Sequence, residues 1–383
     1  MKTKLPSKRY RIVAVIFSFF VFVHLAFSLQ KILTSLAPDF SIFYYSTVDF
    51  MRGINPYTDI HLYTVYNYPP LTNTLYLPLV LLPYHVSQAL FIMLSFISVF
   101  IIVYFSMKLS QLKLNFEMYI TVVSLVLLSF PTKFTLGMGQ SNLIAYALLL
   151  IGLYLFEKNI RVGSSVLIGL AILFKPMLVL ILLVFFINRK WKELMMIGVF
   201  IGVFACIVLW WGRGTLFISF FQTVLPKLFK TQGIQTYYNQ SFSSFVARLT
   251  TSEFYLRLLS FLCNGTLLAY ALIFLKKNKA NKALQYGFIL TVLVIINNLS
   301  WQHHFIVLIY PFIFCMKLCL ESKSKIHFLL LLFTYLLVSW NFKNPIPFSW
   351  FPANLLLSHQ LYGAIIIASL LAFSSPQSSA KNI

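Results

Sequence analysis

The feature that most constrains this chain is a series of long apolar runs separated by short basic segments. Apolar residues make up 60 % of the 383 residues and charged residues 10 %, whereas a soluble domain carries about 25 % charged residues. A helix needs about 20 apolar residues to cross the hydrocarbon core of a bilayer, and fewer where it stops part-way. The sequence therefore predicts an all-α, polytopic membrane protein and excludes a soluble enzyme or a disordered chain.

About twelve runs are predicted to form transmembrane helices. They cover residues 12–30, 85–107, 117–131, 141–156, 162–174, 176–187, 195–211, 254–275, 283–300, 302–316, 326–340 and 355–373. The apolar stretch 71–82 is short and lies between prolines, so we expect a half-buried or re-entrant helix there. Because no repeat, low-complexity segment or soluble domain interrupts the pattern, residues 1–383 are predicted to form a single integral membrane domain.

The charge is strongly positive and unevenly distributed, with 30 Lys+Arg against 8 Asp+Glu. If the N-terminus is cytoplasmic, 20 of these 30 cations fall in the predicted inner segments, which are 1–11, 108–116, 157–161, 188–194, 276–282, 317–325 and the tail after 373. Cytoplasmic loops of membrane proteins are enriched in Lys and Arg. We therefore predict a multi-pass protein of the cytoplasmic membrane with both termini inside. The positive charge indicates topology and contact with anionic lipid, not a nucleic-acid partner.

Two predicted outer segments are long, residues 31–84 and 212–253. Both are rich in aromatic residues and proline, so they are not expected to be disordered. Phe40–Met51 and Leu216–Phe229 have the partly amphipathic pattern of helices that lie in the membrane interface. Long ordered loops commonly carry function, and any chemistry is therefore expected at the outer face.

Seven of the eight carboxylates divide into two groups. Four Glu are expected at the cytoplasmic ends of spans as ordinary interfacial residues, namely Glu117, Glu157, Glu193 and Glu321. Asp39 lies at the outer mouth of the first span, where it is either a functional carboxylate or the N-cap of the helix that follows. Asp49 is expected on the exposed face of that helix, and Asp59 in a turn.

The remaining outer polar residues form a suggestive set. Lys175 lies at the tip of a short helix hairpin, where an unpaired ammonium is costly, so it needs a carboxylate or a bound anion. His303 and His304 follow a tryptophan at an outer hairpin, and adjacent side chains point apart on a helix, so one of the two is expected to reach a site. The other candidates are Tyr68, Gln140, Asn142, Asn239, Gln240 and Arg248. No metal-ligand spacing occurs, so neither a metal nor another cofactor is predicted.

These fragments, in this order, resemble glycosyltransferase family 87, whose members have the polytopic C-type fold. The matching pieces are Asp39-Phe40, Gly53-Ile54-Asn55-Pro56-Tyr57, Tyr68-Pro69-Pro70-Leu71, Gly139-Gln140-Ser141-Asn142, Gly169 to Lys175-Pro176, Asn239-Gln240-Ser241 with Arg248, and Trp301-Gln302-His303-His304. Each motif is weak alone, and the ordered set is the specific signal. Asn297-Asn298-Leu299-Ser300 departs from the proline-containing turn expected before Trp301.

The resemblance implies an α-mannosyltransferase or related enzyme that uses a polyprenyl-phosphate sugar at the extracytoplasmic face, with Asp39 as catalytic base. The partners it implies are the lipid donor, a glycolipid or glycan acceptor and membrane lipids. The oligomeric state is not predicted.

The residue types suit this chemistry. A carboxylate can take the proton of an acceptor hydroxyl, whereas a polyprenyl phosphate leaves as a stable anion and needs cations or hydrogen-bond donors. We expect Lys175, Arg248 and one of His303 and His304 on the phosphate side. Gln140, Asn239 and Tyr68 are expected to bind sugar hydroxyls, and Asn142 and Gln240 are further substrate-binding candidates. Direct displacement would invert the anomeric centre.

Two other classes of protein fit the sequence less well. A glycosidase needs a pair of carboxylates across the scissile bond, and no such pair is evident. A lipid or glycolipid transporter would share the many spans, and the hairpin around Lys175 suits it, but internal symmetry is missing.

Overall fold

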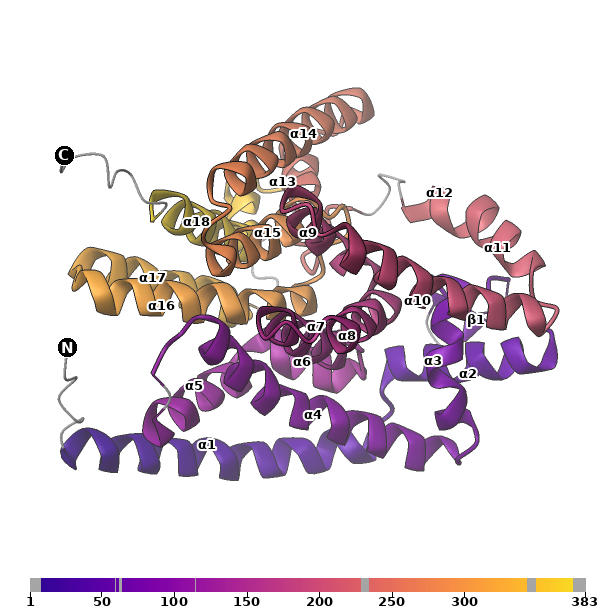
Figure 1. Ribbon diagram of the computed structural model, residues 1–383, viewed down its shortest axis with the longest axis horizontal. Coiled ribbons are helices and arrows are strands. Elements are labelled where there is room, and N and C mark those ends of the chain that lie inside the picture. The colour runs from indigo at the N-terminus through magenta and orange to yellow at the C-terminus, as the bar shows by residue number, and fades with distance from the viewer. Residues whose placement is uncertain are drawn as a thin grey trace.

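The computed structural model describes residues 8–58, 60–61, 64–113, 115–228, 234–342 and 349–374. Nearly all regular structure in these residues is helical (Figure 1). The α-helices are α1 (Lys8–Thr34), α2 (Pro38–Arg52), α3 (Pro70–Val80), α4 (Tyr84–Leu109), α5 (Phe116–Leu128), α6 (Phe130–Met138), α7 (Asn142–Glu157), α8 (Arg161–Phe174), α9 (Leu182–Ile187), α10 (Trp191–Trp210), α11 (Thr215–Ser219), α12 (Leu225–Leu228), α13 (Phe242–Leu249), α14 (Glu253–Lys277), α15 (Lys282–Ile296), α16 (Ile309–Ser322), α17 (Lys325–Ser339) and α18 (His359–Phe373).

Shorter elements complete the described fold. Three are 3₁₀-helices, η1 (Pro176–Ile181), η3 (Gln302–Leu308) and η4 (Ala353–Ser358), and η2 (Phe220–Val224) is a π-helix. The strands β1 (Ile60–His61) and β2 (Thr64–Val65) pair antiparallel as a small hairpin.

The prediction of about twelve spans is not confirmed. Within the described residues, six helical segments are long and apolar enough to cross a membrane, and the bent pair of α5 and α6 would be a seventh. The six are Arg11–Arg52, Tyr84–Leu109, Trp191–Trp210, Glu253–Lys277, Gln302–Ser322 and Ala353–Phe373. The other apolar helices have 10–17 residues, whereas a full crossing needs about 20. An apolar run in the sequence thus predicts that a helix forms, but not that the helix crosses the membrane.

Two helix breaks near the outer polar motifs have local causes. α5 and α6 meet at an angle of 63°, at Ser129, and Pro131 in the first turn of α6 cannot donate to the α5 hydrogen-bond ladder. α8 ends at Lys175, whose backbone leaves the helical region (φ −142°, ψ 89°) immediately before Pro176. The residue before a proline disfavours helical geometry, and this is why the chain turns at the lysine.

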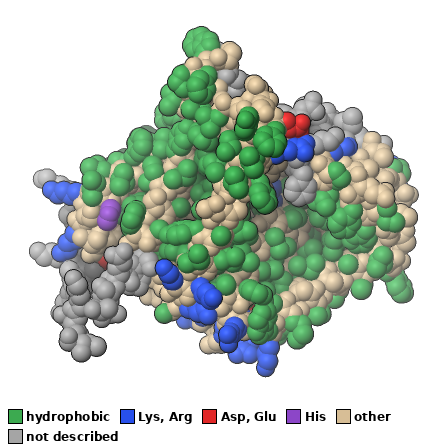
Figure 2. Space-filling view, turned by 90° about the horizontal axis from the view of Figure 1, so that it is seen from above, with side chains coloured by type: hydrophobic (Ala, Val, Ile, Leu, Met, Phe, Trp, Pro, Cys, Tyr) green, Lys and Arg blue, Asp and Glu red, His purple; other side chains and the backbone are tan. Residues whose placement is uncertain are grey.

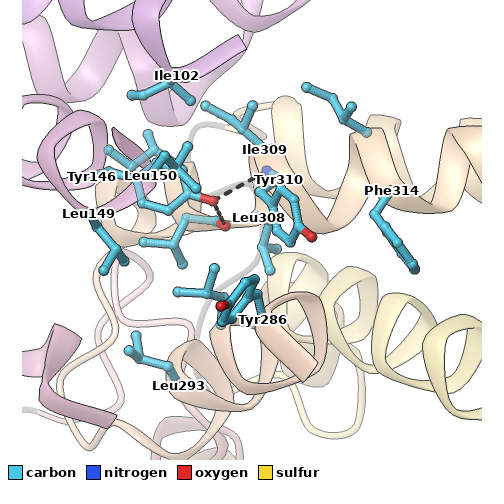
Figure 3. Packing of buried hydrophobic residues seen from close by; sticks show 14 of the residues in the cluster. Ile102, Tyr146, Leu149, Leu150, Tyr286, Leu293, Leu308, Ile309, Tyr310 and Phe314 are labelled. Carbon is cyan, nitrogen blue, oxygen red and sulfur yellow. Dashed lines mark hydrogen bonds between the residues drawn. The ribbon is translucent and has the colours of Figure 1, made fainter. Parts of the chain in front are cut away.

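The main core lies where α4, α7, α15 and α16 pack together. Figure 3 shows Tyr146 of α7 beside Tyr310 of α16 at its centre. The Tyr146 hydroxyl donates to the Val307 carbonyl (2.6 Å) and accepts from the Tyr310 amide (3.3 Å). This bond pairs a buried hydroxyl that would otherwise be costly, and it fixes the end of η3 against α7.

A second, aromatic core surrounds α2 and α3. Phe43 stacks on Tyr76 with ring centroids 4.8 Å apart, and Phe40 lies 5.0 Å from Phe91 of α4. The C-terminus of α2 is capped by Arg213, whose Nε donates to the Phe50 carbonyl (2.9 Å). The described part of the first segment predicted as a long outer loop is therefore packed, and α2 is held along its length and at its end.

The surface of the described residues suits lipid. Figure 2 shows hydrophobic side chains spread over much of the visible face, with Lys and Arg mainly toward its left and lower edges. α14 stands out from the bundle (Figure 1), and its Phe261 is 76 % exposed. Exposed apolar faces of this extent indicate a membrane environment, and the chain is a multi-pass membrane protein.

Candidate functional site

Asp39 lies in the first turn of α2, after Pro38, and the N-cap of that helix is Ala37. The alternative that Asp39 is itself the N-cap is therefore wrong, and its carboxylate is not used to close the helix. The first turn of a helix favours negative charge, because unpaired N–H groups point toward it. One carboxylate oxygen, Oδ2, accepts a hydrogen bond of 2.8 Å from the Gln140 amide nitrogen.

Gly139 makes this contact possible. Its φ of +67° lies in the left-handed region, and a Cβ there would lie 2.6 Å from the Phe40 Cβ and 2.9 Å from the Ala37 Cβ. Only glycine has both the freedom for this φ and the space for this approach. The turn between α6 and α7 can therefore press against the start of α2, and Gln140, the next residue, reaches Asp39.

The same amide also binds Lys175. The lysine Nζ donates to Gln140 Oε1 (3.3 Å) and to the Tyr68 hydroxyl (2.7 Å). The four side chains thus form a continuous hydrogen-bonded series of carboxylate, amide, ammonium and phenol, which we call the Asp39–Lys175 chain. It joins α2, the segment before α3, the α6–α7 turn and the α8–η1 break.

Lys175 is held in this position by its neighbours. Thr72 of α3 donates to the Leu173 carbonyl (2.9 Å) and so fixes the end of α8 beside α3. The hydroxyl of Tyr57 donates to the Tyr68 carbonyl (2.9 Å), just before the Pro69-Pro70 corner. Lys175 is only 6 % exposed. Burial lowers the pKa of its ammonium to about 7, although the Asp39 charge opposes this shift.

η3 brings a group of buried polar side chains to the same region. Gln302, His303 and His304 are all buried, and both histidine rings lie within electrostatic range of the Lys175 ammonium. The Nδ1 atoms of both histidines and both amide atoms of Gln302 are buried without a hydrogen-bond partner among the described residues. Buried polar atoms are normally paired, so this group is suited to form hydrogen bonds with a bound molecule.

The two histidine rings do not point apart as the sequence predicts for a helix. Their centroids are 4.6 Å apart with the planes nearly perpendicular. Asn142 donates to the His303 carbonyl (3.0 Å), so the Asn142 side chain positions η3. The unusual stretch before Trp301 is also anchored, since Ser300 donates to the Asn239 side chain (3.0 Å).

Asn239, Gln240 and Arg248 lie in a neighbouring cluster. Arg248 donates to Ser358 and to the Thr236 and Asn239 carbonyls (2.9 Å each). Burial lowers its pKa to about 10.

The two amides of this cluster also bind the protein itself. Gln240 donates to the Leu357 carbonyl (2.8 Å) and Asn239 to the Asn298 carbonyl (3.1 Å). No hydrogen bond joins any of the three residues to the Asp39–Lys175 chain within the described structure. They tie the segment around α13 to η4 and to the residues before η3.

The remaining carboxylates are accounted for separately. Each of the five Glu lies within 4.0 Å of a Lys or Arg, in the pairs Glu117–Arg11, Glu157–Lys282, Glu193–Arg161, Glu253–Arg257 and Glu321–Lys317. Asp49 is buried in α2, which corrects the expectation that it is exposed. Asp59 lies outside the described residues. Among the residues that the structure describes, no group of His, Cys, Asp and Glu could hold a metal ion.

The sequence matches the model of a known protein family. The model of glycosyltransferase family 87 matches residues 66–296, which is more than half of the chain. The chain belongs to glycosyltransferase family 87. Comparison with curated proteins finds no match. The resemblance seen in the motifs is confirmed, and family membership makes the chain a membrane glycosyltransferase, which needs a sugar donor and an acceptor.

The family match covers part of the site. Tyr68, Gln140 and Lys175 lie inside the matched segment, whereas Asp39 and η3 lie outside it. The structure joins the two parts, because Gln140 bonds to Asp39 and Asn142 bonds to the backbone of η3. For a glycosyltransferase this arrangement offers a carboxylate and a cation in one buried cluster of polar side chains.

Two residues at this candidate site were not predicted from the sequence. Gln302 is fully buried, and its side-chain amide has no hydrogen-bond partner among the described residues. Its position directly before two histidines is the sequence feature that could have indicated it. Phe134 of α6 packs against the His303 ring at 5.4 Å and against Tyr238 at 5.6 Å. No polar motif marks Phe134, because its position depends on the bend between α5 and α6.

Proposed function

We propose that this family 87 enzyme transfers a hexose, mannose by default, from a polyprenyl-phosphate donor to a hydroxyl of an acceptor lipid or glycan. The observation that supports the proposal most is the Asp39–Lys175 chain, in which a carboxylate and an ammonium flank one amide. A proton acceptor and an anion-binding group are the two functions that this transfer needs. No metal or other cofactor is required for it.

The proposed reaction is a single displacement. The Asp39 carboxylate takes the proton of the acceptor hydroxyl as its oxygen attacks the anomeric carbon. The bond from that carbon to the phosphate oxygen breaks, and its electron pair leaves with the polyprenyl phosphate. Attack from the face opposite the phosphate inverts the anomeric centre, so a β-linked donor gives an α-linked product.

The phosphate side is assigned to Lys175 and η3. The negative charge on the leaving oxygen grows as the bond breaks, and fixed cations or donors stabilise it more in a buried site than in water. Lys175 supplies the charge, and Gln302, His303 and His304 supply unpaired hydrogen-bonding atoms. Arg248 is the weaker candidate for this side, because its guanidinium already binds Ser358 and two carbonyls.

We place the site at the extracytoplasmic face of the cytoplasmic membrane. The distribution of Lys and Arg supports cytoplasmic termini. In Figure 1, α1 begins and α18 ends at one side of the molecule, while α2 and α3 lie toward the other. A lipid-linked donor suits this face, because nucleotide sugars are absent there and the donor must stay in the membrane.

The test is transfer by purified protein in lipid nanodiscs. Radiolabelled β-linked polyprenyl phosphomannose is the donor, octyl α-mannoside is the acceptor, and a nucleotide-sugar donor is the control. The expected result is labelled dimannoside with an α linkage, from the lipid donor only. Transfer from the nucleotide sugar, or a β-linked product, would contradict the proposal.

The same protein in sealed vesicles separates the enzyme from the alternative of a lipid transporter, which the break at Lys175 would also suit. An enzyme should form new glycoside when donor and acceptor are supplied on the same side of the membrane. Movement of the donor between leaflets without new glycoside would favour the transporter.

A further inference from the structure

Gln140 lies between the two charged groups of the site with both ends of its amide engaged. The nitrogen donates to Asp39 at 2.8 Å, and the oxygen accepts from Lys175 at 3.3 Å. Only this orientation of the side-chain amide is favourable. If the amide were flipped, its oxygen would face the Asp39 carboxylate and its nitrogen would face the Lys175 ammonium, so that two acceptors and two donors would meet. The side chain is 7 % exposed, so water cannot easily replace either bond.

The backbone holds this amide in place independently of the two charges. The backbone nitrogen of Gln140 donates to the Thr135 carbonyl (3.0 Å), which closes the turn after α6. Gly139 presses the same turn against the start of α2. The side chain therefore extends from a fixed point toward the gap between α2 and the end of α8.

We propose that Gln140 is a positioning residue that separates Asp39 from Lys175 by the width of one amide. This inference rests on the proposed function and assigns Gln140 a role other than binding sugar. In a buried site a direct ion pair would be strong, and it would neutralise both partners. With the amide between them, the carboxylate keeps a free oxygen for the acceptor proton, and the ammonium keeps its charge for the phosphate.

The sugar-binding role expected from the sequence fits the contacts less well. A side-chain amide has two N–H donors and an oxygen with two lone pairs, and in Gln140 one donor and one lone pair are already used by charged partners. Hydrogen bonds to charged groups are the stronger class, so a neutral hydroxyl would not readily displace them.

The titratable groups around Lys175 determine which pKa the pH dependence of transfer would report. Asp39 of α2, Tyr68 before α3, Gln140, and the two histidines of η3 face it. Burial raises the pKa of Tyr68 above the range of the assay, so the phenol stays neutral. An alkaline limb near pH 7 would therefore follow the Lys175 ammonium.

The experiment compares Gln140→Met with the native enzyme in the nanodisc transfer assay. Methionine keeps the size of the side chain and removes both hydrogen bonds, so Lys175 should pair directly with Asp39. We expect kcat to fall at least tenfold, KM for octyl α-mannoside to stay within twofold, and the alkaline limb to move up by one pH unit or more. Gln285→Met is the control, because Gln285 is also buried and bonds to Leu275 and Asn188 away from the site.

A second variant, and a structure of the first variant, test the positioning role separately from the loss of activity. Gln140→Glu retains an acceptor for Lys175 but removes the donor to Asp39, and it should also lose kcat. A structure of Gln140→Met should place Lys175 Nζ within ion-pair distance of an Asp39 oxygen, whether or not activity is measured. A raised KM with an unmoved pH limb, or a structure in which the two charges stay apart, overturns the inference. Absence of transfer by the native enzyme would instead overturn the proposed function.

Discussion

Lys175 is the residue whose burial has the clearest functional consequence. A fully exposed lysine is charged throughout the physiological range, but burial brings the pKa of this ammonium to about 7. The charged form therefore predominates only below that pH in the protein without ligand. Binding an anion favours the charged form, so affinity for the donor and protonation of Lys175 are linked.

The linkage predicts the pH dependence of donor binding. The donor phosphodiester carries one negative charge at every pH from 5 to 9, so only the protein titrates in this range. The dissociation constant, measured without acceptor, should be constant below about pH 7 and should rise about tenfold per pH unit above it. Lys175→Met should bind more weakly and lose this dependence, whereas Lys192→Met, at an exposed position in α10, should keep it. A native dissociation constant that is flat from pH 6 to 9 would contradict the role of Lys175.

At the same scale, the sequence identified the important residue types better than their contacts. Asp39, Gln140, Lys175 and Tyr68 stand out separately along the chain, and the structure joins them in one hydrogen-bonded series. Their hydrogen bonds cannot be predicted from spacing, because the partners come from segments 35 to 107 residues apart. Arg248 shows the reverse case, since nothing in the sequence tells a guanidinium that anchors a loop from one that faces a ligand.

At the scale of elements, the α6–α7 turn is the part that assembles the site. It carries Gly139 and Gln140, and it is pressed against α2 by a contact that admits no side chain at residue 139. The helix that precedes it is short and bent away from α5 by 63°. The turn is thus placed by the break at Ser129, which the uninterrupted apolar run predicted over residues 117–131 did not reveal.

Gly139→Ala tests this assembly. The new Cβ would meet Phe40 and Ala37 and would be strained at φ +67°, so the turn must move away from α2 and Gln140 must leave Asp39. We expect transfer to fall at least tenfold and the protein to be destabilised by about 1–3 kcal/mol. Activity and the melting temperature in detergent are the measurements.

Gly137→Ala is the matched control for that variant. Gly137 lies in α6, and a Cβ added there would have no neighbouring atom within 4 Å. Alanine in a helix is favoured over glycine by about 0.5–1 kcal/mol, so this variant should keep activity and melt at the same or a higher temperature. Equal loss of activity in both variants would show that α6, and not the contact at residue 139, is what matters.

At the scale of the whole molecule, the apolar runs predicted where helices form but not how far each one extends. Each predicted span corresponds to a helix or a pair of helices, yet only six or seven of them qualify as crossings in the described structure. The reason is that helices buried inside a bundle are as apolar as helices that face lipid. Length and bends decide between these cases, and both depend on tertiary packing.

The orientation of the molecule is open to a direct test by cysteine labelling. The positive-inside distribution predicts that residue 192 faces the cytoplasm and that residue 251 faces outward. After replacement of the four native cysteines, Thr251→Cys should react with a membrane-impermeant maleimide in intact cells. Lys192→Cys should react only after the membrane is permeabilised. The opposite pattern would place the Asp39–Lys175 chain on the cytoplasmic side and would contradict the proposed donor.

The central claim is that Asp39 takes the proton of the acceptor hydroxyl, and its most direct test is the rate of transfer by Asp39→Asn. The amide keeps the size of the side chain but cannot act as a base, so kcat should fall about 10²–10⁴-fold while donor binding persists. Asp49→Asn makes the same change at a buried position of the same helix and should retain most of the activity. Near-native transfer by a correctly folded Asp39→Asn enzyme would contradict the account.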